Sequence, residues 1–403
     1  MNTKLDRRRL LQLAAGSVVL PFVSTVVGAK TSVDGASSRN GKRVILIELS
    51  GANDGLNTLV PYSDDRYYEL RPTIGLKPKE FTSITDDFAL HSELRMAMPL
   101  WEQGDMAVVQ GLGYPVPNRS HFESIAIWET GGDGRESGRD GWVTHALEHA
   151  YANSDIDAHG VSFGGGMNIF SSDSGTWLSF ESARQLLKAK TSGLLAVPAS
   201  SAATSSVNPA MELLLERNVQ LQRAIGNIRA KLQANRFKSK IPGRSLGKQL
   251  RHVVHLIAAG VDAPVYKVSL SGFDTHANQK DRHKRLLKEF AAGLSSFATE
   301  LQQMDEWSNT LVVTYSEFGR RARENFGGGT DHGTAAPHMV IGGSANGGLW
   351  GDHPDLGNLQ SDDLIHTMDY RSVYQRLLSD WLEIPENKYT RYRDNRLDNL
   401  FKV

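Results

Sequence analysis

Acidic and histidine side chains follow predicted strands, and the stretch Lys267–Gln279 shows the pattern most clearly. Small and apolar residues run up to Gly272, and Asp274 and His276 follow two residues apart. Carboxylate oxygen and imidazole nitrogen are the donors that zinc, manganese and related divalent ions accept. A carboxylate and an imidazole at the end of a buried strand therefore indicate a metal-dependent site.

Four other segments place polar side chains near the ends of predicted strands. They carry Asn53 and Asp54, Asn118 to His121, Glu317 and Arg320, and Asp331, His332 and His338. A single such residue is usually a cap or a solvated loop residue, but five glycine-flanked endings favour one shared site. Ligands of parallel sheets bind at the carboxyl edge of the strands, so these groups are expected to meet there. Two metal ions at this edge could clamp both oxygens of an in-line displacement, with a hydroxyl or a metal-bound water attacking.

Ser120 has two interpretations. It follows a turn rich in Pro and Asn and precedes HFESIAIWE, which can form a helix. Backbone N–H groups at a helix start favour an anion, so the hydroxyl could attack an ester held there. Serine is also a preferred N-cap that stabilises a helix by about 1 kcal/mol without any chemistry.

The elements that would position these groups alternate along the chain. Strands are predicted at Val44–Leu49, Met106–Pro115, from His159, from Thr310 and at Pro337–Gly343. Apolar residues at helical spacing predict helices over 214–232, 246–257, 290–304 and 370–384. Strands that alternate with long helices predict an α/β fold with a mostly parallel sheet and helices on both faces.

Composition excludes several classes of protein. Lys plus Arg equals Asp plus Glu at 45 each, which argues against a nucleic-acid partner. The absence of cysteine excludes disulfides, thiolate catalysis and cysteine-ligated zinc. Hydrophobic residues make up 40% of the 403 residues, enough for a sizeable core.

Residues 1–29 resemble a twin-arginine signal peptide. Arg7–Arg9 precede an apolar run from Leu10, and Val27–Ala29 offers a small-residue cleavage site. An uncleaved membrane anchor is the alternative, but Pro21 and the short apolar core favour a signal peptide. The twin-arginine export machinery is therefore an expected partner. The mature protein is expected in the periplasm or secreted, without stable membrane insertion.

Residues 30–403 are predicted to form a single domain. The segment Lys190–Pro209 is rich in Ser and Ala and reads as a long surface excursion. Together with the helical pattern that follows it, this predicts a helical and loop excursion around 185–245.

Five segments together resemble an exported bacterial family called domain of unknown function 1501. They are LIELSGANDGLNTLVPY, PNRSHFESIAIWETG, GFDTHANQ, VVTYSEFGR and DHGTAAPHMVIGG, and the resemblance covers nearly all of the mature chain. That family is placed in the alkaline-phosphatase-like superfamily, with sulfatases and phosphodiesterases. The resemblance implies a three-layer α/β/α sandwich around a mainly parallel sheet, with a two-metal site at its carboxyl edge.

The resemblance also implies roles for individual residues. Ser120 matches the nucleophile, and Arg320 could hold a phosphate or sulfate oxygen, its alternative being a surface charge. The implied ligands of divalent metal, zinc or manganese, are Asp54, Asp274, His276, Glu317 and His332.

Two departures from the superfamily pattern leave the occupancy of both metal positions open. Glu317 stands where an Asp-His pair normally ends a late strand, and Asp274 and His276 are two rather than four residues apart. A second register places Asp331 with His332 on the Asp-His pair and His338 on the last histidine.

The predicted function is hydrolysis of a phosphate or sulfate ester, small-molecule or polymeric, by an exported metal-dependent enzyme. A catalytically degenerate protein that serves periplasmic binding or assembly is the alternative. A third interpretation is a sugar-binding platform of tryptophans. However, Trp101, Trp128 and Trp142 lie among apolar neighbours, which indicates core positions.

Overall fold

A computed structural model of the chain describes residues 41–152, 154–172, 174–182 and 209–402. The predicted signal peptide and the part of the predicted excursion up to residue 208 lie outside the described residues. None of the helices within these ranges combines the length and the apolar character that crossing a bilayer needs.

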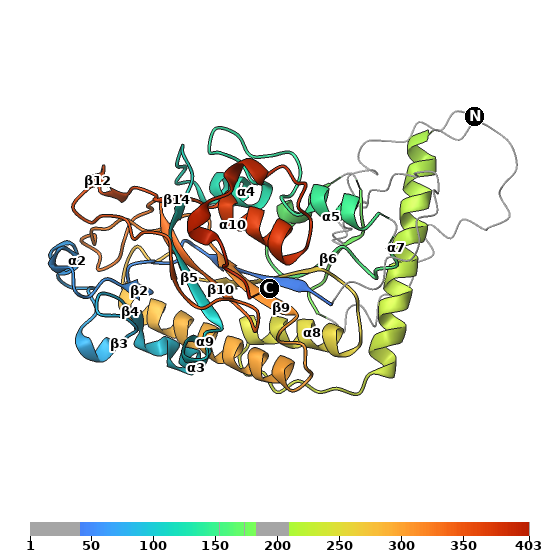
Figure 1. Cartoon of the computed structure of the whole chain (residues 1–403), viewed down its shortest axis with the longest axis horizontal. Coiled ribbons are helices and arrows are strands. Elements are labelled where there is room, and N and C mark those ends of the chain that lie inside the picture. The colour runs from blue at the N-terminus through green and yellow to red at the C-terminus, as the bar shows by residue number, and fades with distance from the viewer. Residues whose placement is uncertain (1–40, 153, 173, 183–208, 403) are drawn as a thin grey trace, which may run out of the picture.

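A nine-stranded mixed sheet forms the centre of the structure (Figure 1). Across the sheet lie, in order, β11 (Gly348–Trp350), β5 (Met106–Gly113), β10 (Ala336–Ile341), β9 (Thr310–Tyr315), β1 (Arg43–Ser50), β8 (Val265–Ser271), β6 (Gly160–Phe163) and β7 (Trp177–Ser179), and β14 (Met368–Asp369) pairs with β5. The strands predicted from the sequence are all present in this sheet.

The direction of β10 decides which segments meet at the carboxyl edge. β10 runs antiparallel to β5 and β9, whereas β1 is parallel to β8 and β9, and β6 is parallel to β7 and β8. The predicted mainly parallel sheet is therefore confirmed, with one reversed strand among those described. Because of this reversal, β10 begins at the edge where β1, β8 and β9 end. The β9–β10 loop, residues 316–335, consequently leaves and re-enters the sheet at that same edge.

Helices cover both faces of the sheet (Figure 1). One face carries α3 (Met98–Glu102), α8 (Leu246–Ala258) and α9 (Gln279–Gln302), and the other carries α4 (His121–Thr130), α5 (Thr144–Ala150) and α10 (Arg371–Arg376). Side chains of β1 alternate between the two cores: Ile45 and Ile47 pack with α8 and α9, whereas Val44 and Leu46 pack with α4 and α10. A strand buried on both faces needs the continuous apolar run that its sequence shows, and the three-layer arrangement is confirmed.

The remaining elements lie around this sandwich. A small sheet contains β2 (Leu59–Val60), β4 (Ala89–His91) and β3 (Phe81–Ser83); α2 (Asp65–Leu70) lies nearby in the chain, and β12 (Leu359–Gln360) pairs with β13 (Asp363–Leu364). The long α7 (Pro209–Ala234) lies at the opposite end of Figure 1 from α2.

The segment 370–384, predicted as one helix, is α-helical only over α10, Arg371–Arg376. After α10, residues Leu377–Trp381 form a π-helical turn, a type of turn that is usually short. Trp128 and Trp142 are buried and Trp101 packs against the core, which confirms their predicted core positions.

Candidate metal centre

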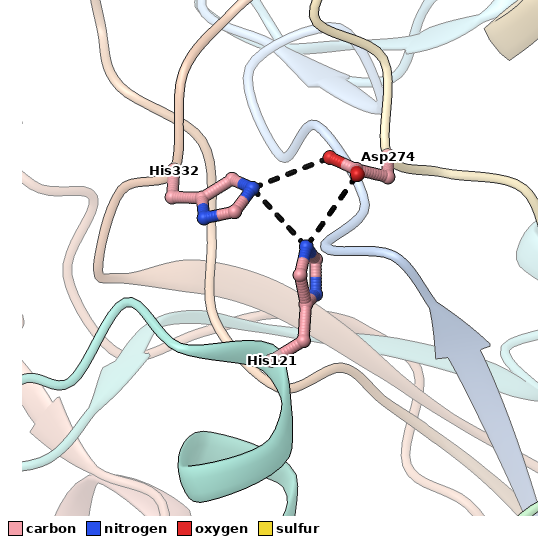
Figure 2. Close-up of side chains that lie close together, drawn as sticks. All are labelled: His121, Asp274 and His332. Atoms are coloured by element: carbon pink, nitrogen blue, oxygen red, sulfur yellow. Dashed lines mark hydrogen bonds and ion pairs between the residues drawn. The ribbon is translucent and has the colours of Figure 1, made fainter.

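Histidine rings and a carboxylate converge at the carboxyl edge of the sheet. His121 is the first residue of α4, Asp274 follows β8, and His332 lies in the β9–β10 loop. Figure 2 shows the two rings and the carboxylate turned toward one another, and one ligand atom from each lies within 4.8 Å of the others. His276 adds a third ring, because its Nε2 lies 2.9 Å from Nε2 of His332 and 3.1 Å from Oδ1 of Asp274. The structure thus brings together three of the predicted ligands and adds His121.

Each of the three rings has an oxygen acceptor at its Nδ1 atom. Nδ1 of His121 lies 2.6 Å from Oε1 of Glu317, and Nδ1 of His276 lies 3.2 Å from Oδ1 of Asp331. Nδ1 of His332 lies 2.8 Å from the carbonyl oxygen of Arg119. Carboxylate and carbonyl oxygens accept hydrogen bonds, so each Nδ1 carries the hydrogen. A neutral ring then keeps its lone pair on Nε2. This arrangement is typical of histidines that bind metal through Nε2.

Nε2 of His332 therefore presents its lone pair to Nε2 of His121 and to Nε2 of His276. Nε2 of His332 lies 3.1 Å from Nε2 of His121 and 2.9 Å from Nε2 of His276. Lone pairs at this distance repel unless a proton or a cation lies between them. Zinc binds imidazole nitrogen at about 2.0–2.1 Å with tetrahedral geometry, which puts neighbouring nitrogens about 3.3 Å apart. Nε2 of His121, Nε2 of His332 and a carboxylate oxygen of Asp274 consequently form a group that fits a single divalent cation such as zinc, and Nε2 of His276 adjoins this group beside His332.

Asp274 is the anionic member of the cluster. Burial raises its pKa, but the hydrogen bond and charge of Arg320, whose Nη2 lies 2.7 Å away, outweigh burial and lower the pKa to about 2. Asp274 is therefore ionised wherever the imidazoles are neutral, as a metal ligand must be.

Gly51 connects two parts of the site. It follows β1 with φ +109°, and a Cβ atom there would lie 2.4 Å from the backbone nitrogen of Asp274. Its N–H donates to Oε1 of Glu317 at 2.9 Å. A side chain at this position would push the Asp274 segment away from the cluster.

Glu317 is buried and orients His121 rather than facing the shared centre. We expect Glu317→Gln to weaken zinc binding about 10–100-fold, the usual cost of losing an outer partner of a ligating histidine. In the metal-free protein the Glu317 hydrogen bond is the main cause that raises the pKa of His121, so this pKa should fall in the variant. Chelator competition measures the zinc affinity and NMR titration of the ring measures the pKa. Glu383→Gln, on the surface, is the matched control, and equal affinities in both variants would contradict the orienting role.

Ser120 occupies the N-cap position of α4. Its backbone is extended, and its exposed side chain makes no capping hydrogen bond to the first turn. Its backbone N–H donates to Oδ1 of Asn118 at 2.8 Å. The hydroxyl therefore stands beside the ligand His121 without the bond that the capping interpretation requires.

Arg320 is fully buried, so the alternative of a surface charge is wrong. Its guanidinium donates to the carbonyl oxygens of Ala52 and Thr330, both at 2.9 Å, as well as to Asp274. These protein acceptors occupy its donors, so the structure gives Arg320 the role of positioning Asp274. The predicted contact of Arg320 with a substrate anion does not follow from this geometry.

Asp54 lies in a separate buried network. Its Oδ2 accepts from Nη1 of Arg71 at 2.7 Å and from Gln279, and neither the carboxylate nor the guanidinium is exposed by more than 1%. Burial raises the pKa of Asp54, but the charge and hydrogen bond of Arg71 outweigh burial and lower it. Asp54 is not part of the ligand group found among the described residues, and the guanidinium of Arg71 supplies the positive charge beside its carboxylate.

The second register fails for His338. This residue lies inside β10 with its ring against Trp128, and burial lowers its pKa to about 3. His121, in contrast, was named among the polar residues at strand ends but was not assigned as a metal ligand. Its position could have indicated a ligand, because it directly follows the serine predicted to start a helix and lies near the end of a predicted strand.

Fold and site together define an α/β protein with a three-layer sandwich and a candidate metal centre at the carboxyl edge of its sheet. Residues 249–378 match the model of the family described as "Protein of unknown function (DUF1501)", which confirms the family resemblance over this region. The matched region contains Asp274, His276 and His332 but not His121. Comparison with the sequences of curated proteins gives no match.

Solved structures with a similar arrangement share little sequence with this chain. The lipoteichoic acid synthase LtaP from Listeria monocytogenes is 9% identical, with a TM-score of 0.36 over 82% of this chain and 75% of that chain. The C-terminal periplasmic domain of EcEptC from Escherichia coli, in complex with Zn, is 6% identical, with a TM-score of 0.38 over 75% and 72%. A protein in the alkaline phosphatase superfamily from Vibrio parahaemolyticus is 10% identical, with a TM-score of 0.35 over 87% and 72%.

Proposed function

We propose that this protein is an exported, metal-dependent hydrolase of phosphate or sulfate esters. The observation that carries the proposal is the convergence of three Nε2 atoms on Asp274, each ring being oriented by its own acceptor. A zinc or manganese ion held there by His121, His332 and Asp274, with His276 beside them, would stabilise negative charge on the ester oxygens during displacement. Export through the twin-arginine machinery belongs to the proposal and rests on the sequence of residues 1–29.

The chain itself supplies a nucleophile and a place for the anion. The uncapped hydroxyl of Ser120 precedes the ligand His121, and the N–H groups of the first turn of α4 favour an anionic group beside it. Oγ of Ser120 would lose its proton and bond to phosphorus or sulfur while the bond from that atom to the ester oxygen breaks, and the alcohol would leave with the proton. Water would then cleave the seryl ester, which releases phosphate or sulfate and restores the hydroxyl. The ring of Phe318 is buried and packs against both imidazoles, with ring centroids 4.9 Å from His121 and 4.8 Å from His332.

Ser120→Ala tests the proposed nucleophile. The zinc-loaded protein should hydrolyse 4-nitrophenyl phosphate or 4-nitrophenyl sulfate, and the variant should lose this turnover while it keeps its zinc. Release of nitrophenol and the metal content of the same samples are measured together. Ser83→Ala, an exposed serine in β3, should behave like the wild type. Equal turnover by Ser120→Ala would show that water attacks in place of the serine, and no turnover by any metal-loaded form would contradict the proposed hydrolysis.

A binding or assembly role is the second candidate. It is favoured by the Arg71–Asp54 ion pair, which withholds a carboxylate from the centre. This role requires zinc binding that stabilises the protein without turnover of any ester. The same set of measurements therefore separates the two functions.

A further inference from the structure

Large apolar side chains are exposed around the candidate metal centre. Six such side chains stand out among the described residues, and four lie in loops at the carboxyl edge or in the first turn of α4. These four, called the apolar rim below, are Val116 (41% exposed), Phe122 (87%), Phe326 (114%) and Ile365 (39%). The other two are Met96 and Val219, and Val219 lies on α7, away from α4 in Figure 1. Single exposed apolar residues are ordinary on a protein surface, but a group of them beside a polar centre indicates a binding site.

Phe122 directly follows the ligand His121 in the first turn of α4. The side of α4 that packs into the core is formed by Ser124, Ile127 and Trp128, which are buried. Phe122 is not on that side, so packing does not account for its aromatic ring. Its place in the chain ties the ring to the start of the helix that also carries Ser120.

Phe326 is presented by an ordered part of the β9–β10 loop. Oδ1 of Asn325 accepts from the N–H groups of Gly327 at 2.9 Å and Gly329 at 3.1 Å, which fixes the turn around Phe326. Nδ2 of Asn325 donates to the carbonyl oxygen of His276 at 2.9 Å and to Oδ1 of Asp331 at 3.1 Å. The turn that holds Phe326 outward is thus bonded to the ligand His276 and to the carboxylate that orients its ring.

The glycines of this turn permit its close approach to the site. A Cβ atom on Gly327 would lie 2.9 Å from the carbonyl oxygen of His276, and one on Gly329 would lie 2.4 Å from its carbonyl carbon. The loop therefore lies directly against the ligand segment. An aromatic ring that is fully exposed on a tied loop is available for contact with a bound molecule.

We infer that the substrate ester joins its phosphate or sulfate to a large apolar alcohol, aromatic or long-chain, and that Phe122 and Phe326 bind this apolar part. The inference rests on the proposed function, since the anionic part of the ester would lie at the metal centre. Because Phe122 directly follows His121 and the turn of Phe326 is bonded to His276, the non-reacting part of an ester bound there would extend toward the apolar rim. A polar alcohol such as glycerol would gain nothing from these side chains.

Binding of non-hydrolysable phosphonates tests this inference independently of turnover. The zinc-loaded wild type should bind phenylphosphonate about tenfold more tightly than methylphosphonate, the range expected for contacts between aromatic rings. The double variant Phe122→Ser, Phe326→Ser should bring this ratio close to one. Val219→Ser removes an exposed apolar side chain from α7 and should keep both the ratio and the zinc content. Calorimetry gives the affinities and elemental analysis confirms the zinc.

Three outcomes separate the possibilities. A preference for phenylphosphonate that disappears only in the double variant supports binding of the apolar part by Phe122 and Phe326. This result would stand even if no ester is turned over and the proposed hydrolysis fails. Equal affinity of the wild type for both phosphonates, or a ratio that the double variant retains, overturns the inference. Binding of the wild type to phosphatidylcholine vesicles that is lost in the double variant, with an unchanged phosphonate ratio, assigns the rim to lipid contact and also overturns it.

Discussion

His332→Ala is expected to reduce zinc affinity by more than about a hundredfold, beyond the usual cost of losing an outer partner. His332 is the ring that the other ligand atoms share: its Nε2 lies within 3.3 Å of Nε2 of His121, Nε2 of His276 and Oδ1 of Asp274. Chelator competition measures the affinity. Zinc at about 100 times its Kd should stabilise the wild type by about 2.7 kcal/mol, and this gain should disappear in the variant.

The control for this experiment is His149→Ala, which removes an exposed histidine from α5. It should leave the zinc affinity and the zinc-dependent rise in melting temperature unchanged. Because His332 is partly exposed, the metal-free variant should melt close to the metal-free wild type. A zinc affinity in His332→Ala equal to that of the wild type would show that the cation is held elsewhere.

Arg71→Met is expected to destabilise the folded protein by about 3–5 kcal/mol at neutral pH, because the variant leaves the buried charge of Asp54 without its main partner. The folded-state pKa of Asp54 is lowered, so the ion pair stabilises above the ordinary pKa of 3.8, and this contribution is lost as pH falls through the folded value. The destabilisation should shrink in acid, where Asp54 becomes protonated. Urea unfolding at pH 7 and at lower pH measures both effects.

An exposed ion pair supplies the comparison. Arg66 and Asp355 form a pair at 2.8 Å in which both side chains are about half exposed, and Arg66→Met should cost less than about 1 kcal/mol. Asp54→Asn combined with Arg71→Met should recover part of the stability, because it removes the unpaired charge. Equal losses for Arg71→Met and Arg66→Met would contradict the account of Asp54 as a compensated buried charge.

The strands and the three-layer arrangement were predictable because apolar runs and helical spacing are local signals. The run Val44–Leu49 has the composition of a strand buried on both faces, and β1 is such a strand. The direction of β10 was not predictable, because an apolar run looks the same in either direction. His332 was nevertheless expected at the carboxyl edge, and it lies there because a reversed strand begins where its neighbours end.

The candidate site was predictable only in part, for the same reason. Asp274, His276 and His332 carry a local signal, namely a carboxylate or imidazole beside glycine near the end of a strand. Asp54 forms a buried ion pair with Arg71, the residue after α2. An ion pair between residues distant in the sequence leaves no periodic pattern from which it could be predicted. The buried position of Arg320 likewise depends on carbonyl groups from two other segments, those of Ala52 and Phe273.

The reversed direction of β10 also makes the β9–β10 loop exchangeable. A hairpin anchored in two neighbouring strands can change its length and composition while strand register and core stay intact. This hairpin carries both a metal ligand, His332, and the protruding ring of Phe326. Randomising only Phe326, while Gly327 and Gly329 stay as they are because a side chain on either would press on His276, would therefore produce a library in which selectivity diverges while the scaffold is inherited unchanged.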